Sequence, residues 1–316
     1  MRIISAQQVE TIDWSADAST YFVAALGYES RARFAAETIL ALDPECNRHA
    51  FGFAERKVLA RDDNKHAFER LRFDITDDVP SKDGTVLGEY VKRLLLSSPK
   101  NKINLVVDYS CMSKTWYAEI IRMLSESSLT DRSVSVYFTY SPAKYTPPGS
   151  PGTNRVAGAI SGFCHLAPPT FPTALILGLG YEAVRATGLR DYLDPKETFA
   201  FYTDPSLEEL FTKTVIKNNR ALLSTLGRDT AFPHPLADLD YTSALLANLT
   251  QSLNERYRVV IAPLGPKPFC LLSLLLSAET KSVDVWRVSG AEHSTPEERK
   301  AFGKLLIYCV RYGNSP

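Results

Sequence analysis

The chain has 316 residues, 45% of them hydrophobic, and its 36 basic residues balance its 36 acidic residues. This length suits two domains of roughly 150 residues, and the apolar fraction is sufficient for each to bury a core. The balanced charge excludes an extended nucleic-acid surface and a general attraction to anionic membranes, so any polyanion must bind at a local site.

The five cysteines are widely spaced and form no C-x-x-C pair, a pattern typical of reduced thiols in the cytoplasm rather than of disulfides or a zinc site. The first residues lack the apolar core of a signal peptide, and the longest apolar stretch, residues 269–276, is too short to cross a bilayer. We therefore expect a cytoplasmic protein without a membrane anchor.

The first half of the chain alternates strands and helices after an irregular or edge segment at residues 1–20. Residues 104–124 predict a strand, a tight turn and a helix in direct succession, and the charged stretch 55–78 predicts exposed helix and loop. The other predicted strands are 21–26, 49–54 and 134–140, and the other predicted helices are 32–42 and 85–97.

Prolines and glycines then accumulate, which predicts a linker at residues 146–172 between a first domain, 1–145, and a second domain, 173–316. In the second domain, strands are predicted at 174–179, 198–203 and 282–288, helices at 184–192, 207–223, 241–257 and 296–311, and a strand, turn and helix in direct succession over 258–277. The last helix is predicted from a capping signal, in which Thr295 and Pro296 precede two glutamates.

The two halves share an internal repeat. Leu26-Gly27-Tyr28-Glu29 recurs 153 residues later as Leu179-Gly180-Tyr181-Glu182, and Lys267 follows Lys114 by the same interval. Two separate landmarks in one register indicate a tandem duplication. The fold class is therefore α/β, with two Rossmann-like parallel-sheet domains related by duplication and packed as a pseudo-dimer.

The turn from Ser110 to Lys114 follows a strand and opens a helix, where backbone N–H groups, hydroxyls and an ammonium group converge in a way that suits a phosphate. The alternative is that Ser110 or Ser113 caps the helix while Lys114 is solvated. In the second copy Gly265 would let a ligand approach the backbone, and Lys267 would supply the charge.

The Gly-Tyr-Glu turns follow the first strand of each copy and should lie at the same sheet edge as the lysine turns. Glu29 and Glu182 could accept from ribose hydroxyls, and Tyr28 and Tyr181 could stack on a base. The alternative is structural: each glutamate pairs with a nearby arginine, Arg31 or Arg185, and each tyrosine packs under its turn.

Glu29 and Asp108 are the candidate catalytic carboxylates, although the counterpart of Asp108 is Ile261. Cys111 lies near a helix start but has no histidine near it in sequence, so an inert thiol is favoured. The five histidines show no metal-binding spacing, and neither a P-loop nor a complete G-x-G-x-x-G motif is present, so no metal and no cofactor is predicted.

The sequence Asp108-Tyr109-Ser110-Cys111-Met112-Ser113-Lys114 resembles the ligand loop of CRISPR-associated Rossmann-fold (CARF) sensor domains. Two such domains in one chain resemble the SAVED sensors of bacterial antiphage systems. The resemblance implies that a cyclic oligonucleotide lies across the paired domains in contact with Ser110, Ser113, Lys114 and Lys267. It also implies an effector on a separate polypeptide, since neither half is an effector domain.

We therefore expect a bacterial defence sensor or accessory protein that binds a nucleotide or cyclic oligonucleotide between its two copies and signals to a protein partner. One alternative is a nucleotide-processing enzyme, cleaving a glycosidic or phosphodiester bond with Glu29 and Asp108. The other is a non-catalytic scaffold in which the duplication only enlarges an interface.

Overall fold

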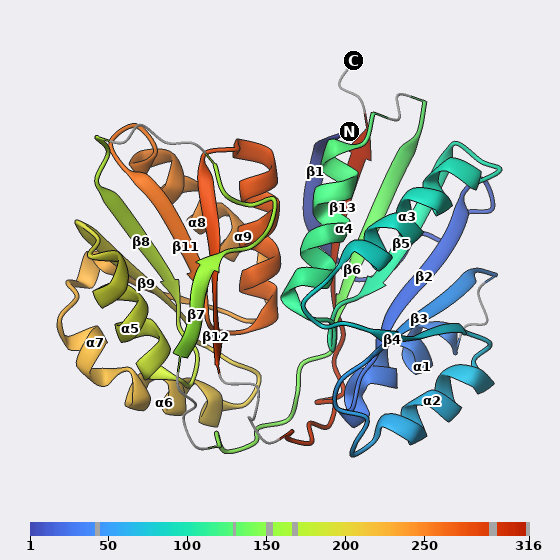
Figure 1. Ribbon diagram of the computed structural model, residues 1–316, viewed down its shortest axis with the longest axis horizontal. Coiled ribbons are helices and arrows are strands. Elements are labelled where there is room, and N and C mark those ends of the chain that lie inside the picture. Colours follow the sequence, from blue (N-terminus) through green and yellow to red (C-terminus); the bar gives the residue numbers. More distant parts are fainter. Residues whose placement is uncertain (42–44, 129–130, 150–153, 166–169, 291–295, 314–316) are drawn as a thin grey trace. The chain divides into compact units, whose positions relative to one another are not determined.

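The computed structural model describes residues 1–41, 45–128, 131–149, 154–165, 170–290 and 296–313 (Figure 1). The chain forms two compact units: unit 1 comprises Met1–Lys144 and Thr295–Pro316, and unit 2 comprises Tyr145–Ser294. The predicted division is thus corrected in two places. The predicted linker belongs to unit 2, and the C-terminal segment belongs to unit 1.

Unit 1 is a seven-stranded sheet in the order β1-β13-β6-β5-β2-β3-β4, in which β2 to β6 are mutually parallel and β13 and β6 are antiparallel. Its strands are β1 (Arg2–Val9), β2 (Ser19–Leu26), β3 (Asn47–Phe53), β4 (Asp74–Val79), β5 (Lys102–Asp108), β6 (Ser133–Tyr140) and β13 (Leu306–Gly313). Its helices are the 3-10 helix η1 (Ser30–Arg33), α1 (Phe34–Leu40), α2 (Arg61–Arg70), α3 (Thr85–Ser97) and α4 (Lys114–Glu126).

The parallel strands β2 and β5 are buried almost throughout, as expected for a sheet that carries helices on its faces. Phe22, Ala24 and Leu26 of β2 pack in one apolar cluster with side chains of α1 and α2. On α4, Trp116 is fully buried and stacks on Phe53 at a ring-centroid distance of 4.0 Å. These contacts fix where the turns after β2 and β5 lie.

Unit 2 has a six-stranded sheet in the order β10-β9-β8-β11-β12-β7, parallel except for β7. Its strands are β7 (Asn154–Ala159), β8 (Thr173–Gly178), β9 (Glu197–Thr203), β10 (Ala231–His234), β11 (Arg258–Pro263) and β12 (Val283–Gly290). Its helices are α5 (Ala183–Leu193), α6 (Glu209–Asn218), α7 (Arg220–Ser224), the 3-10 helix η2 (Arg228–Thr230), α8 (Leu239–Leu253) and α9 (Lys267–Thr280).

Neighbouring residues of β8 enter different clusters, because successive side chains of a strand point to opposite faces. Leu175 and Leu177 pack in the cluster that includes Leu189 of α5, whereas Ile176 packs in the cluster that includes Leu246 of α8. Helices therefore cover both faces of this sheet.

The two sheets have the same strand order. The series β4-β3-β2-β5-β6-β13 in unit 1 corresponds strand for strand to β10-β9-β8-β11-β12-β7 in unit 2, with an antiparallel last strand in both. The predicted fold class, two Rossmann-like α/β domains, is confirmed, and the shared order is what a duplication produces.

The C-terminal segment differs from the prediction. No helix is formed over residues 296–311: residues 306–313 form β13, which pairs with β1 on one side and β6 on the other. Figure 1 shows β13, in red, beside β1, in blue, so the two ends of the chain meet in one sheet. The capping residue Thr295 lies outside the described residues.

Equivalent strands are exchanged between the repeats. β7 follows β6 in the chain but pairs with β12, and β13 follows β12 but pairs with β6. Asn154, the first residue of β7, precedes Ile307 in β13 by the 153-residue interval of the repeat. Each repeat therefore donates its last strand to the sheet of the other repeat.

Candidate functional site at the carboxyl edge of the unit 1 sheet

The strand order reverses between β2 and β5 in unit 1 and between β8 and β11 in unit 2. In open α/β sheets, ligands bind outside the carboxyl ends of the strands at such a reversal. The predicted turns, 27–29 and 109–113 in unit 1 and 179–182 and 264–266 in unit 2, lie at these two positions. The repeat therefore brings each Gly-Tyr-Glu turn beside the lysine turn of the same unit.

Glu29 forms a nearly buried ion pair. Its Oε2 accepts from Arg31 Nε at 2.5 Å, and the side chains of Arg31 and Glu29 are 4% and 16% exposed. Arg31 Nη1 also donates to Ser141 O at 2.8 Å, and the guanidinium lies 5.7 Å from the ring centroid of Tyr140. Burial is the largest single influence and lowers the pKa of Arg31, but the charge and hydrogen bond of Glu29, together with Tyr140 and Cys111, outweigh it and the pKa is raised.

Both glutamates therefore pair with the nearby arginine, as the structural alternative predicts. In unit 2, Glu182 Oε2 accepts from Arg185 Nε at 2.8 Å, but those side chains are 38% and 25% exposed. The ion pair of Arg185 with Glu182 is partly solvated, whereas the ion pair of Arg31 with Glu29 is nearly buried beside the turns of unit 1.

Two asparagines that the sequence analysis missed hold the Gly-Tyr-Glu turns. Asn64 Nδ2, on α2, donates to Gly27 O at 3.0 Å and to Glu29 O at 2.8 Å, and the side chain is fully buried. Asn219 Nδ2, after α6, donates to Gly180 O at 2.8 Å. A search for identical residues near the repeat interval would have found this pair.

The serines of the lysine turn have structural partners. Ser110 is fully buried, and its Oγ donates to Asp108 Oδ1 at 2.5 Å and accepts from Ser141 N at 2.7 Å. Asp108 is itself only 2% exposed. Ser113 is the N-cap of α4, with its side chain accepting from Trp116 N at 3.3 Å. A direct ligand contact with Ser110 would require this packing to open.

The two lysines occupy the same position in the repeat. Lys114 is the first residue of α4 and Lys267 is the first residue of α9, and both are partly exposed. Backbone N–H groups at a helix start and a nearby ammonium group favour an anion.

Tyr28 lies near the charged side chains of Glu29, Arg56 and Arg299. Burial, followed by the charge of Glu29, raises the pKa of the Tyr28 hydroxyl, while a hydrogen bond from Arg56 and the charge of Arg299 act in the opposite direction. Arg56 lies in the loop after β3, and Arg299 lies in the C-terminal segment before β13. Neither arginine belongs to the strand-turn-helix motif, so the sequence pattern does not point to them.

The matching crevice of unit 2 is closed by backbone. Leu264 N donates to Gly178 O at 2.8 Å, and a Cβ added to Gly180 would lie 2.4 Å from Leu264 O. A Cβ on Gly265 would lie 2.4 Å from Leu179 O. The missing side chain of Gly265 makes room for the neighbouring turn, and a ligand contact at Gly265 stays a prediction.

The corresponding contact in unit 1 is between a glycine and a side chain. A Cβ on Gly27 would lie 3.0 Å from Cys111 Cβ, and Cys111 Sγ lies 3.8 Å from Glu29 Oε2. Side chains rather than backbone therefore bound this crevice.

Tyr181 packs against other aromatic rings, as the structural alternative predicts. Its ring stacks on Phe211 at a centroid distance of 5.8 Å, and Tyr145 meets it edge-on at 6.4 Å. Stacking of Tyr181 on a base would compete with these contacts.

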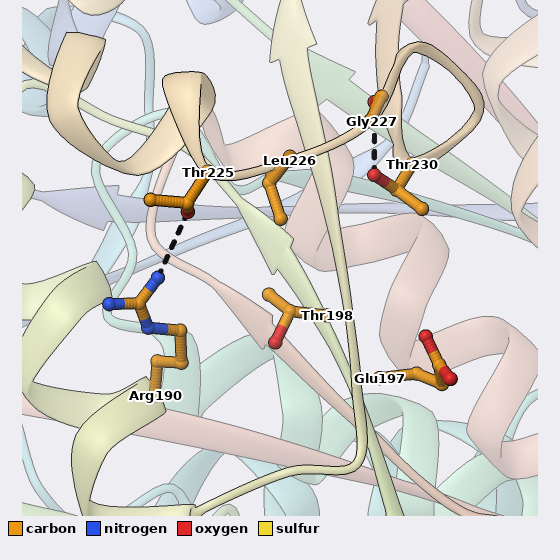
Figure 2. Close-up of a pocket in the computed structure, with 7 residues that line it drawn as sticks. All are labelled: Arg190, Glu197, Thr198, Thr225, Leu226, Gly227 and Thr230. Carbon is orange, nitrogen blue, oxygen red and sulfur yellow. Dashed lines mark hydrogen bonds between the residues drawn. The ribbon is translucent and has the colours of Figure 1, made fainter.

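A shallow, open pocket of about 370 Å³ lies elsewhere in unit 2, at the amino end of β9. Figure 2 shows its lining, where Arg190 donates to Thr225 Oγ1 at 3.2 Å across from Glu197. It contains none of the predicted site residues and lies at the sheet edge opposite the turns.

A Ser-His-Asp grouping in unit 2 does not provide a nucleophile. His165 Nε2 lies 3.1 Å from Ser277 Oγ, but Ser277 is fully buried and donates to Val283 O at 2.6 Å. Asp284 accepts from the His165 backbone rather than from its ring. Among the described residues, no group of three or more His, Cys, Asp or Glu side chains is placed to hold a metal ion.

No model of a known protein family matches the sequence, and no curated protein matches it significantly. Among solved structures, the chain is similar to a putative universal stress protein from Pseudomonas aeruginosa UCBPP-PA14, with 11% identity over 87% of this chain and 94% of that chain at a TM-score of 0.27. A functionally unknown protein from Pseudomonas aeruginosa PAO1 matches with the same identity and coverage at a TM-score of 0.25. Within the described residues, no helix has the length and apolarity needed to cross a membrane.

Proposed function

We propose that unit 1 binds a nucleotide or cyclic oligonucleotide at the carboxyl edge of its sheet and acts as a sensor. The observation that carries the proposal is the difference between the two crevices. The unit 2 crevice is closed by contacts between Gly180 and Leu264, whereas side chains, among them Glu29 and Cys111, bound the unit 1 crevice. Side chains can change rotamer to admit a ligand, whereas backbone packed against backbone cannot, so the reversal point of unit 1 is the better suited of the two.

The charges around this crevice favour an anion. Arg56 and Arg299 lie near Tyr28 on two separate segments, Lys114 is the first residue of α4, and the carboxylate of Glu29 is already neutralised by Arg31. Glu297, which pairs with Arg299 at 3.3 Å, and Glu298, whose carboxylate accepts from Ser30 N, reduce this positive potential only in part. Since the chain has no net charge, such a local cluster is the feature that would attract a phosphate.

The carboxylates support binding rather than turnover. A general acid or base must reach the substrate, but Asp108 is 2% exposed and hydrogen-bonded to Ser110. Glu29 is held in an ion pair with Arg31. A sensor without turnover needs a partner, so the proposal includes a separate effector polypeptide in the cytoplasm, in keeping with a role in phage defence.

The test is calorimetric titration of the full chain with ATP, AMP, cyclic di-AMP and cyclic tetra-adenylate, followed by chromatography of each mixture. The proposal predicts binding of at least one compound with the compound recovered intact. Recovery of a cleaved product would favour the enzyme alternative. No heat from any compound would contradict both and favour a scaffold.

A further inference from the structure

Residues 296–302, which we call the strap, lie over the Gly-Tyr-Glu turn of unit 1. Glu298 Oε1 accepts from Ser30 N at 2.9 Å, and Arg299 O accepts from Arg31 N at 3.3 Å and from Ser30 Oγ at 3.4 Å. The strap therefore contacts the two residues that follow Glu29.

The far side of the strap is fixed to the segment after β6. Lys300 O accepts from Lys144 N at 2.9 Å, Phe302 N donates to Pro142 O at 2.9 Å, and Ala143 and Ala301 form an antiparallel bridge. β13 begins four residues later, between β1 and β6. The strap thus has a firm anchor at its C-terminal end and lighter contacts at the turn.

The contacts at the turn are of the kind that open locally. Residues 296–302 are half-buried or exposed, so few apolar contacts oppose their separation from Ser30. Segments held by a few exposed hydrogen bonds lie at the low end of the local stability range.

The equivalent segment of unit 2 has a different chemistry. Tyr145, which precedes Glu298 by the interval of the repeat, donates its backbone N–H to Glu208 Oε1 at 3.0 Å and places its ring against Tyr181. The cover of the closed unit 2 crevice is therefore aromatic, and the cover of the unit 1 crevice is polar and charged.

We propose that the strap is a closing element of the unit 1 site, in which Arg299 contacts the anionic part of the ligand and the hydrogen bonds of Ser30 to Glu298 and Arg299 hold the element shut. This inference rests on the proposed nucleotide site. It assigns a binding role to a segment that enters unit 1 from the end of the second repeat. A bound ligand would therefore act directly on the segment through which the chain re-enters unit 1.

The experiment measures release of labelled ATP and labelled cyclic tetra-adenylate from the full chain by stopped-flow fluorescence. Glu298→Ala removes the acceptor of Ser30 N, and we expect release about five-fold faster, the effect of one lost hydrogen bond. Glu298→Gln keeps an acceptor oxygen and should release at close to the wild-type rate. Glu208→Ala, the matched change in unit 2, should leave release unchanged.

Hydrogen exchange supplies the second readout. Without ligand, amides of residues 27–33 should exchange faster in Glu298→Ala than in wild type, and ligand should slow exchange over 296–302 in wild type. Binding with equal release rates in wild type and Glu298→Ala, or with unchanged exchange of the strap, would overturn the strap inference alone. Failure of both probes to bind would overturn the proposed function, and the inference with it.

Discussion

Arg31 shows how a single residue ties the site to the stability of unit 1. A guanidinium that is 4% exposed is tolerated because Glu29, Ser141 and the face of Tyr140 compensate for its lost hydration. Glu29 is therefore needed by the fold whether or not it also meets a ligand. The sequence allowed both interpretations, because an arginine two residues away does not reveal how deeply the pair is buried.

Glu29→Gln should lower the free energy of unfolding by about 3 kcal/mol, because it leaves the buried charge of Arg31 without its counter-ion. Glu182→Gln is the matched control, since the pair with Arg185 is partly solvated, and it should cost less than about 1 kcal/mol. Urea denaturation of both variants measures the difference. Equal losses would contradict the assignment of Glu29 to a buried pair.

His234 predicts a pH dependence. It is 3% exposed, its Nδ1 lies 3.2 Å from Thr242 Oγ1, and burial lowers its pKa from 6.5 to about 4. Between these two values the unfolded chain binds more protons than the folded chain, so this contribution to stability is complete above pH 6.5 and is lost as the pH falls toward 4.

The loss attributable to His234 should reach about 3 kcal/mol near pH 4. Denaturation of wild type and His234→Gln at a series of pH values isolates it, because the carboxylates titrate in both proteins. A constant difference between the two proteins from pH 7 to pH 4 would show that His234 does not titrate differently on folding.

At the scale of elements, local sequence signals were reliable where a segment's partners are its chain neighbours. The strand-turn-helix of β5 and α4 was predicted in place, and Ser113 caps the helix as one interpretation required. β4 and β10 were missed, because Asp74–Val79 is polar and Ala231–His234 contains a proline. Both are outermost strands of their sheets, where burial imposes little pattern.

β13 was predicted as part of a helix because a capping signal preceded an apolar segment. Its structure is decided by β1 and β6, which lie far away in the sequence and leave a space between them for one strand. A local sequence pattern carries no information on strands that pair with it from far away in the chain. The same holds for β7, which lay inside the predicted linker.

The contrast between buried and exposed neighbouring side chains in β13 gives a direct test that this segment is a strand. Val310 is fully buried, and Arg311 is exposed. Val310→Ala should cost about 2 kcal/mol of unfolding free energy through lost burial and a small cavity, whereas Arg311→Ala should stay within about 0.5 kcal/mol. Denaturation curves that rank the two variants in the opposite order would contradict the strand.

At the scale of the whole molecule, the repeat interval predicted the duplication and the two-sheet fold but not the exchange of final strands. The shared landmarks lie in the turns after β2 and β5 in one repeat and after β8 and β11 in the other, and these turns carry no information on which sheet the last strand joins. The site residues were likewise predicted only in part. The motif identified the turns, while Arg56, Asn64 and Arg299 come from segments that only the fold brings near them.

The central claim is that unit 1 carries the ligand site and unit 2 does not. Lys114 and Lys267 open equivalent helices, so they form a matched pair for calorimetric titration with the nucleotide panel. The account predicts that Lys114→Ala weakens binding by about 1–3 kcal/mol, the range for a lost charged hydrogen bond, and that Lys267→Ala binds like wild type. Equal losses in both variants, or unchanged affinity in Lys114→Ala, would contradict it.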